Sequence, residues 1–470
     1  MTISTVALPS IFEILKPAVG PSSSHTLGAM MAARAFMEKA AQPAAAMGAG
    51  ARIRVTLYGS LALTGRGHLT DVAIAAGLAG CGPRELVGTT LVEVQERVRK
   101  AGCVGVGDRE FLFDADRDVI FDVTPRDLPH PNTMRFDVLD LEGNEALSET
   151  YVSVGGGRLA GGTFGPLVRD LAQHGRASAG AVVSACVRLN IDLVEHVYRT
   201  EELDHGYSRT EVDAHLDEMW ALMRRANDRG LAAEGILPGS LRLERRARTL
   251  YRNFLGLLPH FHVLSPEASL VSIYAMAVAE ENAAGGAVVT APTCGSCGVV
   301  PACLRVVEEK MGLRPEQIRR ALAVAGWIGA VIAADASISG AEVGCQGEIG
   351  AASAMAAGAV CYLLGGTVSD QIDRAAESAL EHYLGLTCDP IDGLVQIPCI
   401  ERNAAGAVSA LNAASLAMIS GGGDRVSFDA VVDAMRRTGH DLDSRYKETA
   451  LGGLAAGPGL GGATTPGIED

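Results

Sequence analysis

AEVGCQGEIGAASAMAAGAVCYLLGG, residues 341–366, is the most informative stretch for the fold of this chain. It is rich in alanine and glycine and poor in bulky side chains, so a helix built from it can pack backbone to backbone against its neighbours. In a membrane this texture is typical of associating helices, but Glu342, Gln346 and Glu348 favour a buried helix of a soluble protein around a site. The stretch therefore predicts a close-packed helical core.

The sequence around this stretch continues the helical pattern. From about Ala177 onward, apolar residues recur at helical spacing in the segments 182–202, 212–230, 313–338 and 369–385. We therefore expect the second half of the chain to be nearly all helix.

The first part of the chain has a different texture. From about Arg52 to Asp140, alternating or β-branched runs such as ARIRVTLYGS and MRFDVLDLEG are separated by turn residues and by the helix-like LTDVAIAAGLAG. This pattern predicts an α+β fold, with a mixed N-terminal domain followed by a mostly α-helical catalytic domain. We place the first domain at residues 1–165, a glycine-rich-to-helical linker at 166–176, the helical domain at 177–455 and a flexible tail at 456–470.

Composition limits the function classes. A chain of 470 residues, 48% hydrophobic, can bury a sizeable core. The net charge of −15 argues against a nucleic acid or an anionic membrane as partner. The N-terminus lacks the pattern of a secretory signal, and no window reaches about 18 uninterrupted apolar residues. Because no export signal is found, the ten cysteines favour free thiols and metal ligation over disulfides, and we expect a cytoplasmic protein.

Three cysteines, Cys345, Cys388 and Cys399, are candidate metal ligands. Three thiolates can hold a cubane iron–sulfur cluster and leave one iron without a protein ligand. Their spacing matches neither a ferredoxin nor a zinc ribbon, so buried inert thiols remain an alternative. The stretch 389–398, DPIDGLVQIP, is rich in turn residues and predicts a loop beside two of the thiols.

Other polar motifs are candidates for a small-molecule site. In GPSSSHT, Ser22, Ser23 and Ser24 can cap a helix whose first-turn amides suit a carboxylate, or they form a plain cap. Single histidines such as His68 and His130 are more often structural than catalytic. Cys294 and Cys297 form a C-x-x-C, but their helical, alanine-rich surroundings disfavour a thioredoxin-like redox site.

Several motifs occur together in one order along the chain. They are GPSSSHT (20–26), LYGSLALTGRGHLTD (57–71), HPNTMRF (130–136), SVGGG (153–157), EGILPGSL (234–241), GCQGEIGAASAMAAGA (344–359), CDPIDGLVQIPCIERNA (388–404) and YKETALGGLA (446–455). In these motifs and their order the chain resembles the bacterial iron–sulfur-dependent L-serine dehydratases, in their single-chain form with fused β and α domains.

This resemblance implies a lyase that converts L-serine to pyruvate and ammonia. It implies a [4Fe–4S] cluster held by Cys345, Cys388 and Cys399, whose open iron acts as a Lewis acid on the substrate hydroxyl, and a homodimer. The expected catalytic residues are Ser22, Ser23, Ser24, His25 and Thr26. The expected substrate-binding residues are His68, Asp71, His130, Asn132, Thr293, Cys294 and Gly295. None of the five lysines lies in a recognisable pyridoxal phosphate setting, so we do not expect that cofactor.

The chain departs from the pattern of the family at one loop and at its end. Cys294 stands where the family commonly has Asn, Cys297 where it has a small residue, and no cysteine follows Cys399. A cysteine cannot hydrogen-bond a carboxylate as an amide does. The same chemistry on L-threonine or L-cysteine therefore stays open as an alternative, as does a non-catalytic amino-acid-binding relative. Cys294 is also a candidate for the fourth cluster ligand at rest.

Overall fold

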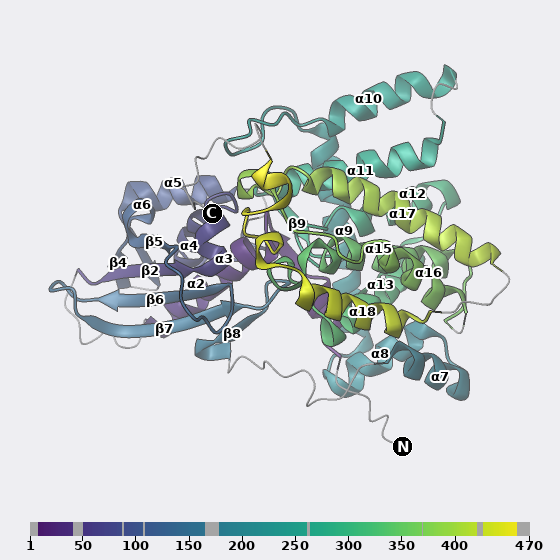
Figure 1. Ribbon diagram of the computed structural model, residues 1–470, viewed down its shortest axis with the longest axis horizontal. Coiled ribbons are helices and arrows are strands. Elements are labelled where there is room, and N and C mark those ends of the chain that lie inside the picture. Colours follow the sequence, from purple (N-terminus) through teal and green to yellow (C-terminus); the bar gives the residue numbers. More distant parts are fainter. Residues whose placement is uncertain are drawn as a thin grey trace.

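The computed structural model describes residues 8–40, 50–86, 89–106, 109–164, 178–260, 264–368, 370–420 and 426–457. A mixed β-sheet with its helices forms one side of the molecule and a helical body forms the other, with the C-terminal segment (yellow) between them (Figure 1). The predicted α+β fold is confirmed. The predicted linker, 166–176, and residues 458–470 of the predicted tail lie outside the described residues.

The sheet has the strand order β3-β4-β2-β6-β7-β8, and β5 also pairs with β2. Its strands are β2 (Arg52–Tyr58), β3 (Cys103–Val106), β4 (Arg109–Leu112), β5 (Val119–Asp122), β6 (Thr133–Leu139), β7 (Glu145–Ser153) and β8 (Leu159–Gly161). β2 runs parallel to β4 and β5 and antiparallel to β6. The helices of this part are α2 (Gly28–Ala40), α3 (Gly59–Thr64), α4 (Thr70–Leu78), α5 (Leu91–Ala101) and α6 (Ala115–Asp118).

The alternating sequence of β2 explains how this sheet buries one face. In RIRVTLY, Ile53, Val55 and Leu57 are fully buried while the residues between them are partly or fully exposed. They join the same core cluster as Phe36 of α2. The ring of Phe136 on β6 lies 5.2 Å from that of Phe36, so α2 packs directly on the sheet.

The second half of the chain is helical, as predicted. Its helices are α7 (Ala179–Leu189), α8 (Leu193–Asp204), α9 (Arg209–Ala232), α10 (Ala247–Leu257), α11 (Pro266–Ala283), α12 (Val299–Met311), α13 (Pro315–Asp335), α14 (Gly340–Val343), α15 (Ile349–Leu363), α16 (Gln371–Glu381), α17 (Cys399–Ile419) and α18 (Phe428–Asp441). One short strand, β9 (Ala287–Val289), interrupts them.

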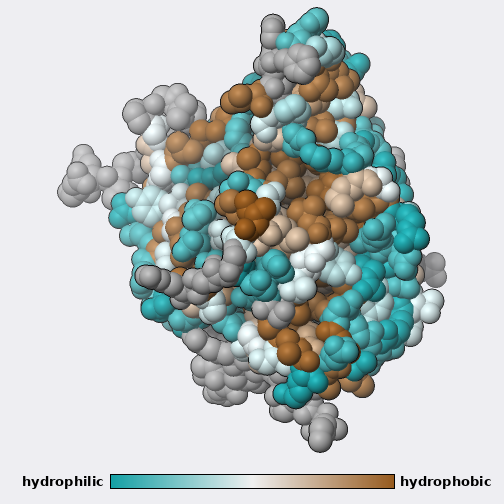
Figure 2. Space-filling view, turned by 90° about the vertical axis from the view of Figure 1, so that its right-hand side faces the viewer, coloured by the Kyte–Doolittle hydropathy of each residue, from teal (hydrophilic) through white to brown (hydrophobic). Residues whose placement is uncertain are grey.

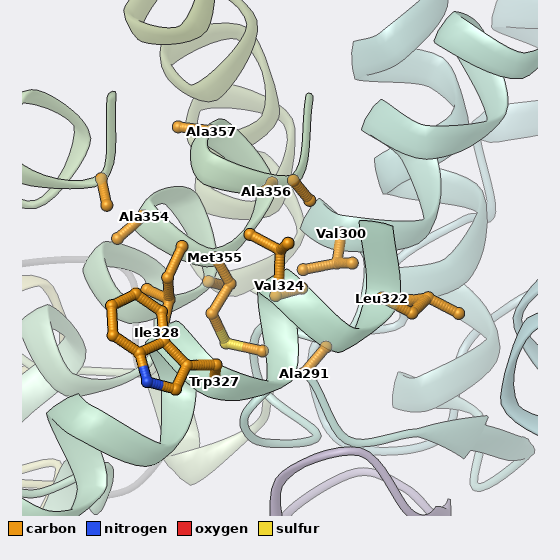
Figure 3. Close-up of a cluster of buried hydrophobic side chains, with 14 of the residues drawn as sticks. Ala291, Val300, Leu322, Val324, Trp327, Ile328, Ala354, Met355, Ala356 and Ala357 are labelled. Carbon is orange, nitrogen blue, oxygen red and sulfur yellow. The ribbon is translucent and has the colours of Figure 1, made fainter. Parts of the chain in front are cut away.

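The helical core is built around α13 and α15. Val324 and Ile328 of α13 face Met355 and the alanines of α15 in one close-packed cluster (Figure 3). By length and composition α13 is apolar enough to cross a membrane, but 78% of its most apolar window is buried inside the fold, so α13 is a core helix. The quoted alanine-rich stretch therefore packs as predicted, although its helix begins only at Ile349.

The N-terminal segment, residues 11–19, packs against the helical body. Ile11 and Ile14 of α1 (Ile11–Ile14) lie in the helical core, where a β-carbon on Gly329 of α13 would lie 2.6 Å from Ile14 Cγ2. The strand β1 (Pro17–Val19) pairs antiparallel with β9. The chain then enters the motif GPSSSHT, which is thereby held against the helical body.

Candidate active site

The GPSSSHT motif forms a π-helical turn that leads into α2. The turn spans Ser23–Leu27, and Ser22 caps it because its hydroxyl accepts a hydrogen bond from the His25 amide at 3.2 Å. Ser23 Oγ accepts a hydrogen bond from the Cys294 amide at 2.6 Å. The turn is thus fastened to a loop of the helical body.

Two buried histidines lie next to each other, His25 within this turn and His68 beside it. The rings of His25 and His68 are 4.5 Å apart, and both side chains are inaccessible to solvent. Both nitrogens of His25 have hydroxyl partners, Ser24 Oγ at 2.8 Å and Ser60 Oγ at 3.0 Å. Burial, together with the neighbouring His68, lowers the pKa of His25 well below its usual value. His25 is therefore locked in place as a neutral ring.

His68 has one committed nitrogen and one free nitrogen. Its Nδ1 lies 2.9 Å from the carbonyl oxygen of Thr64, a geometry in which Nδ1 carries the proton and donates it. Nε2 is buried and has no hydrogen-bond partner among the described residues. Burial lowers the pKa of His68 to about 4. The ring is thus neutral, with a proton-accepting lone pair on Nε2.

Glu448 brings a carboxyl group to this pair. Its Oε1 lies 3.5 Å from both His25 Nδ1 and His68 Nε2, and its Oε2 has no hydrogen-bond partner within the described chain. Burial, reinforced by the Cys345 thiol, raises the pKa of Glu448 to about 8. A carboxyl group held in this position can stabilise positive charge on His68.

Three buried cysteines converge from separate elements. Cys345 lies in the turn between α14 and α15, and Cys399 is the first residue of α17. Cys388 is tied to the C-terminal segment, because its amide donates to the Tyr446 carbonyl at 2.8 Å and its carbonyl accepts from the Glu448 amide at 2.9 Å. All three line one cavity.

Glu348 lies among these thiols. Its Oε2 is 3.7 Å from Cys345 Sγ and 4.0 Å from Cys388 Sγ, and its Oε1 accepts a hydrogen bond from Thr293 Oγ1 at 2.8 Å. Burial, with Glu448 nearby, raises the pKa of Glu348 to about 7. The loop with the sequence TCGSCG, residues 293–298, is thereby connected to the cysteines through the carboxyl group of Glu348.

The cavity joins residues of both halves of the chain. The empty space within it is about 370 Å³, part of it open to solvent. Ser22 and His68 come from the first half, whereas the three cysteines, Glu348 and Glu448 come from the second. Arg402 is the only arginine or lysine among the residues that line it, and it is anchored by Asp389 at 2.9 Å. A small zwitterion would therefore meet both charge signs and a free imidazole nitrogen.

The cysteines suit a metal cluster. Cys345 raises the pKa of Cys388 well above its usual value, and burial with Cys345 does the same for Cys399. Burial and mutual repulsion make these thiols resist ionisation, and Arg402, the cation beside them, opposes this only in part for Cys399. Iron would compensate the remaining negative charge, since thiolates are the ligands that iron–sulfur clusters take. The donor set thus fits a cluster with three cysteine ligands.

The remaining predicted site residues lie outside the cavity lining, apart from Gly295, which belongs to it. His130 accepts a hydrogen bond from the Asn132 amide and pairs with Glu342 at 2.8 Å. Asp71 lies in the first turn of α4. The Cys294 thiol packs in an apolar cluster 3.8 Å from the Val19 carbonyl, which gives no support to a role as cluster ligand.

Three ionisable lining residues were missing from the sequence-based candidates: Glu348, Arg402 and Glu448. Each belongs to a motif that the sequence made visible. Glu348 and Arg402 each follow one of the cavity cysteines by three residues, and Glu448 lies in YKETALGG. Charged residues so close to candidate ligands were the available signal.

In cluster-free protein, Glu448→Gln should change the pH dependence of the free energy of unfolding. The pKa of Glu448 is about 8 in the folded chain, against an ordinary value of 4.5. As the pH rises between these values, the unfolded chain loses a proton that the folded chain keeps, which destabilises the fold by up to about 1.4 kcal/mol per pH unit. Glutamine does not titrate, so the variant lacks this destabilisation. In urea denaturation, the free energy of unfolding of the variant should therefore rise relative to that of wild type from pH 5 to pH 8.

The matched control is Glu234→Gln, at an exposed ion pair with Arg248. Its stability difference from wild type should hardly vary over the same pH range. A Glu448→Gln difference that is equally flat would contradict a buried, protonated carboxyl group at this position.

Comparisons with known proteins identify the family of this chain. Residues 10–162 match the family model of the serine dehydratase beta chain, and residues 188–455 match that of the serine dehydratase alpha chain. The chain is 42% identical to L-serine dehydratase TdcG of Escherichia coli over 95% of this chain and 98% of that protein. It is 42% identical to an L-serine dehydratase of Streptomyces coelicolor and 38% identical to one of Helicobacter pylori, again over 95% of this chain and 98% of each relative. The predicted resemblance is confirmed: the chain belongs to the serine dehydratase family, with the beta and alpha parts joined in one polypeptide.

Proposed function

We propose that this protein is an L-serine ammonia-lyase that converts L-serine to pyruvate and ammonia and carries a [4Fe–4S] cluster on Cys345, Cys388 and Cys399. The observation that carries the proposal is the cavity in which these thiols meet His68, Glu448 and Arg402. Its supports are the chemistry of these donors and the names of the relatives.

Arg402 and two carboxyl groups would hold the substrate. The α-carboxylate of L-serine matches the single guanidinium of the lining, and its ammonium group matches Glu348 and Glu448. Opposite charges at the two ends of a small cavity orient the amino acid. This orientation brings the Cα proton and the hydroxyl group to opposite partners.

His68 is our candidate for the base. Its Nε2 is free, buried and part of the lining, whereas both nitrogens of His25 are occupied by serines. His68 accepts the Cα proton, and Glu448 Oε1, 3.5 Å from His68 Nε2, lies where it can accept a hydrogen bond from the imidazolium that results. His25 and the three serines hold the position of the surrounding turn.

The elimination balances without a further reactant. L-Serine loses its Cα proton to His68 and its hydroxyl group, which together leave as water, and 2-aminoacrylate remains. This enamine tautomerises to the imine, which water hydrolyses to pyruvate and ammonia. A cluster with one iron free of protein ligands supplies Lewis acidity for the loss of the hydroxyl group.

Anaerobically purified protein tests the proposal. We expect about four iron and four sulfide per chain, and equal amounts of pyruvate and ammonia from L-serine. L-Threonine and L-cysteine, tested in parallel, should react more slowly. Protein that contains iron and sulfide but leaves L-serine unchanged would contradict the proposed activity, and active protein without iron would contradict the proposed cofactor.

Cys294→Ala should leave substrate selectivity unchanged. The Cys294 side chain packs among apolar residues, and its backbone amide donates a hydrogen bond to Ser23 Oγ. Alanine keeps that amide, so the ratio of kcat/KM for L-serine to that for L-threonine should stay within about twofold of wild type, a change smaller than that from one lost contact. A larger change would show that this thiol reaches the substrate.

We also propose a cytoplasmic homodimer. All ten cysteines are free, which suits a reducing compartment. Hydrophobic residues form patches on the helical side of the molecule (Figure 2), and α10 with the turn that follows exposes Leu250, Leu255, Leu257 and Leu258. Such an apolar face is typical of a subunit interface.

A further inference from the structure

A second pocket borders the Ser23–Leu27 turn at Leu27. It holds about 1040 Å³ of space, part of it open to solvent. None of its lining residues belongs to the cavity of the candidate active site. Its cationic groups and its apolar wall are contributed by Lys16, Leu27, Met31, Arg84, Arg158 and Phe164.

Two cations of this pocket lack close anionic partners. Lys16 Nζ has its nearest carboxylate, Glu13, at 3.9 Å, and the Glu13 side chain is half exposed. Arg158 Nε is buried without a hydrogen-bond partner in the described part of the chain, and no ion pair of Arg158 is found there. Burial lowers the pKa of both Lys16 and Arg158. The pocket thus holds these two cations, and the one carboxylate of its lining, Glu13, is half exposed and compensates them only in part.

Arg84 differs from these two. Its guanidinium makes a two-pronged ion pair with Glu218, at 3.1 and 3.0 Å, and is largely exposed. The unpaired charge of the pocket is thus confined to Lys16 and Arg158. Beside them, Leu27, Met31 and Phe164 offer an apolar wall.

We propose that this pocket binds a small organic carboxylate with an apolar body. The carboxylate lies between Lys16 and Arg158, where it satisfies the orphaned guanidinium nitrogen, and the apolar part covers the wall. An inorganic anion would satisfy only the charges, so it should bind more weakly than a carboxylate that also buries a hydrocarbon chain.

The pocket is mechanically close to the active site. Lys16 makes hydrogen bonds with Thr290, which precedes the TCGSCG loop. The Thr290 amide donates to the Lys16 carbonyl at 3.0 Å, and Thr290 Oγ1 accepts from the Lys16 amide at 3.2 Å. Leu27 is the last residue of the Ser23–Leu27 turn. A β-carbon on Gly157, also in the lining, would lie 2.6 Å from Leu27 Cδ2. A bound carboxylate would therefore contact residues directly attached to the Ser23–Leu27 turn.

Isothermal titration of the anaerobic holoenzyme with 4-methylpentanoate tests the proposal. We expect saturable binding, at least about tenfold weaker binding of the neutral 4-methylpentanamide, and weaker binding of inorganic phosphate. Arg158→Leu and Lys16→Met should each weaken 4-methylpentanoate binding by at least about tenfold, because each removes a charge-assisted contact. Arg84→Gln, the matched control in the same pocket, should change it less than about twofold.

Other results would overturn the proposal. Absence of saturable binding, or equal binding of acid and amide, contradicts an anion site. Competition by L-serine together with unchanged affinity in Arg158→Leu would place the probe in the active site instead. Arg158→Lys, which keeps the charge, guards against a folding defect: it should restore most of the affinity lost in Arg158→Leu. These binding measurements do not depend on turnover, so they stand or fall separately from the lyase activity.

Discussion

Replacing Cys345, Cys388 or Cys399 by a serine residue should abolish both iron binding and turnover of the substrate L-serine. Each cysteine supplies one of three thiols at the same cavity, and a hydroxyl group is a poor replacement for a thiolate ligand. We expect iron and sulfide to fall to background in anaerobically purified variants. Turnover should fall roughly a thousandfold or more, because loss of the hydroxyl group then lacks its Lewis acid.

Cys361→Ser is the matched control for these variants. Its thiol is also buried, on α15, but it contacts Met418 Sδ at 3.7 Å and does not line the cavity. The control should keep its iron and its activity. If one of the three cavity variants behaved like Cys361→Ser, that cysteine would not be a cluster ligand.

The second large effect is expected at His68. Replacing it by glutamine removes the free Nε2, and loss of a general base lowers rates by about 10²- to 10⁴-fold. Iron and sulfide content should stay at wild-type level, since His68 contacts none of the cysteines through a hydrogen bond in the described residues. Measured together, kcat and metal content therefore separate the base from the cluster ligands.

The pH profile refines this expectation. Because the pKa of His68 is lowered to about 4, its ring is neutral and able to accept a proton at every pH well above that value. Titration of His68 should therefore cause no loss of kcat/KM between pH 8 and pH 6. His196→Gln, at a buried histidine of α8, is the control and should leave the rate unchanged. Full activity of His68→Gln would require another base.

Much of the fold was predictable because its helices and strands follow from local sequence patterns. β2 alternates and the helical segments keep their period, so each element could be found from its own residues. The break near Cys345 was not foreseen: the helix stops at Val343, turns through Gly344–Gly347 and resumes at Ile349. Because of this break, Cys345 lies in a turn and lines the cavity.

The site was only partly predictable because it depends on distant segments meeting. Cys345, Cys388 and Cys399 could be singled out by residue type, and GPSSSHT by its cluster of hydroxyls. The pairing of Glu448 with His68 joins residues far apart in the chain, and no local pattern encodes it. The same holds for β9, a three-residue strand that exists because β1 pairs with it.

That pairing has a consequence for how the protein is made. Residues 11–19 are synthesised well before their partners, because Pro17 pairs with Val289, 272 residues later, and Ile14 packs beside Gly329 of α13, 315 residues later. Closing so long a loop is entropically costly, so these contacts should form late in folding. Until then, the N-terminal residues carry exposed isoleucines, and the helical body has an open apolar groove beside Gly329. The nascent chain is therefore most vulnerable to misassembly just before residues 11–19 pack against β9 and α13.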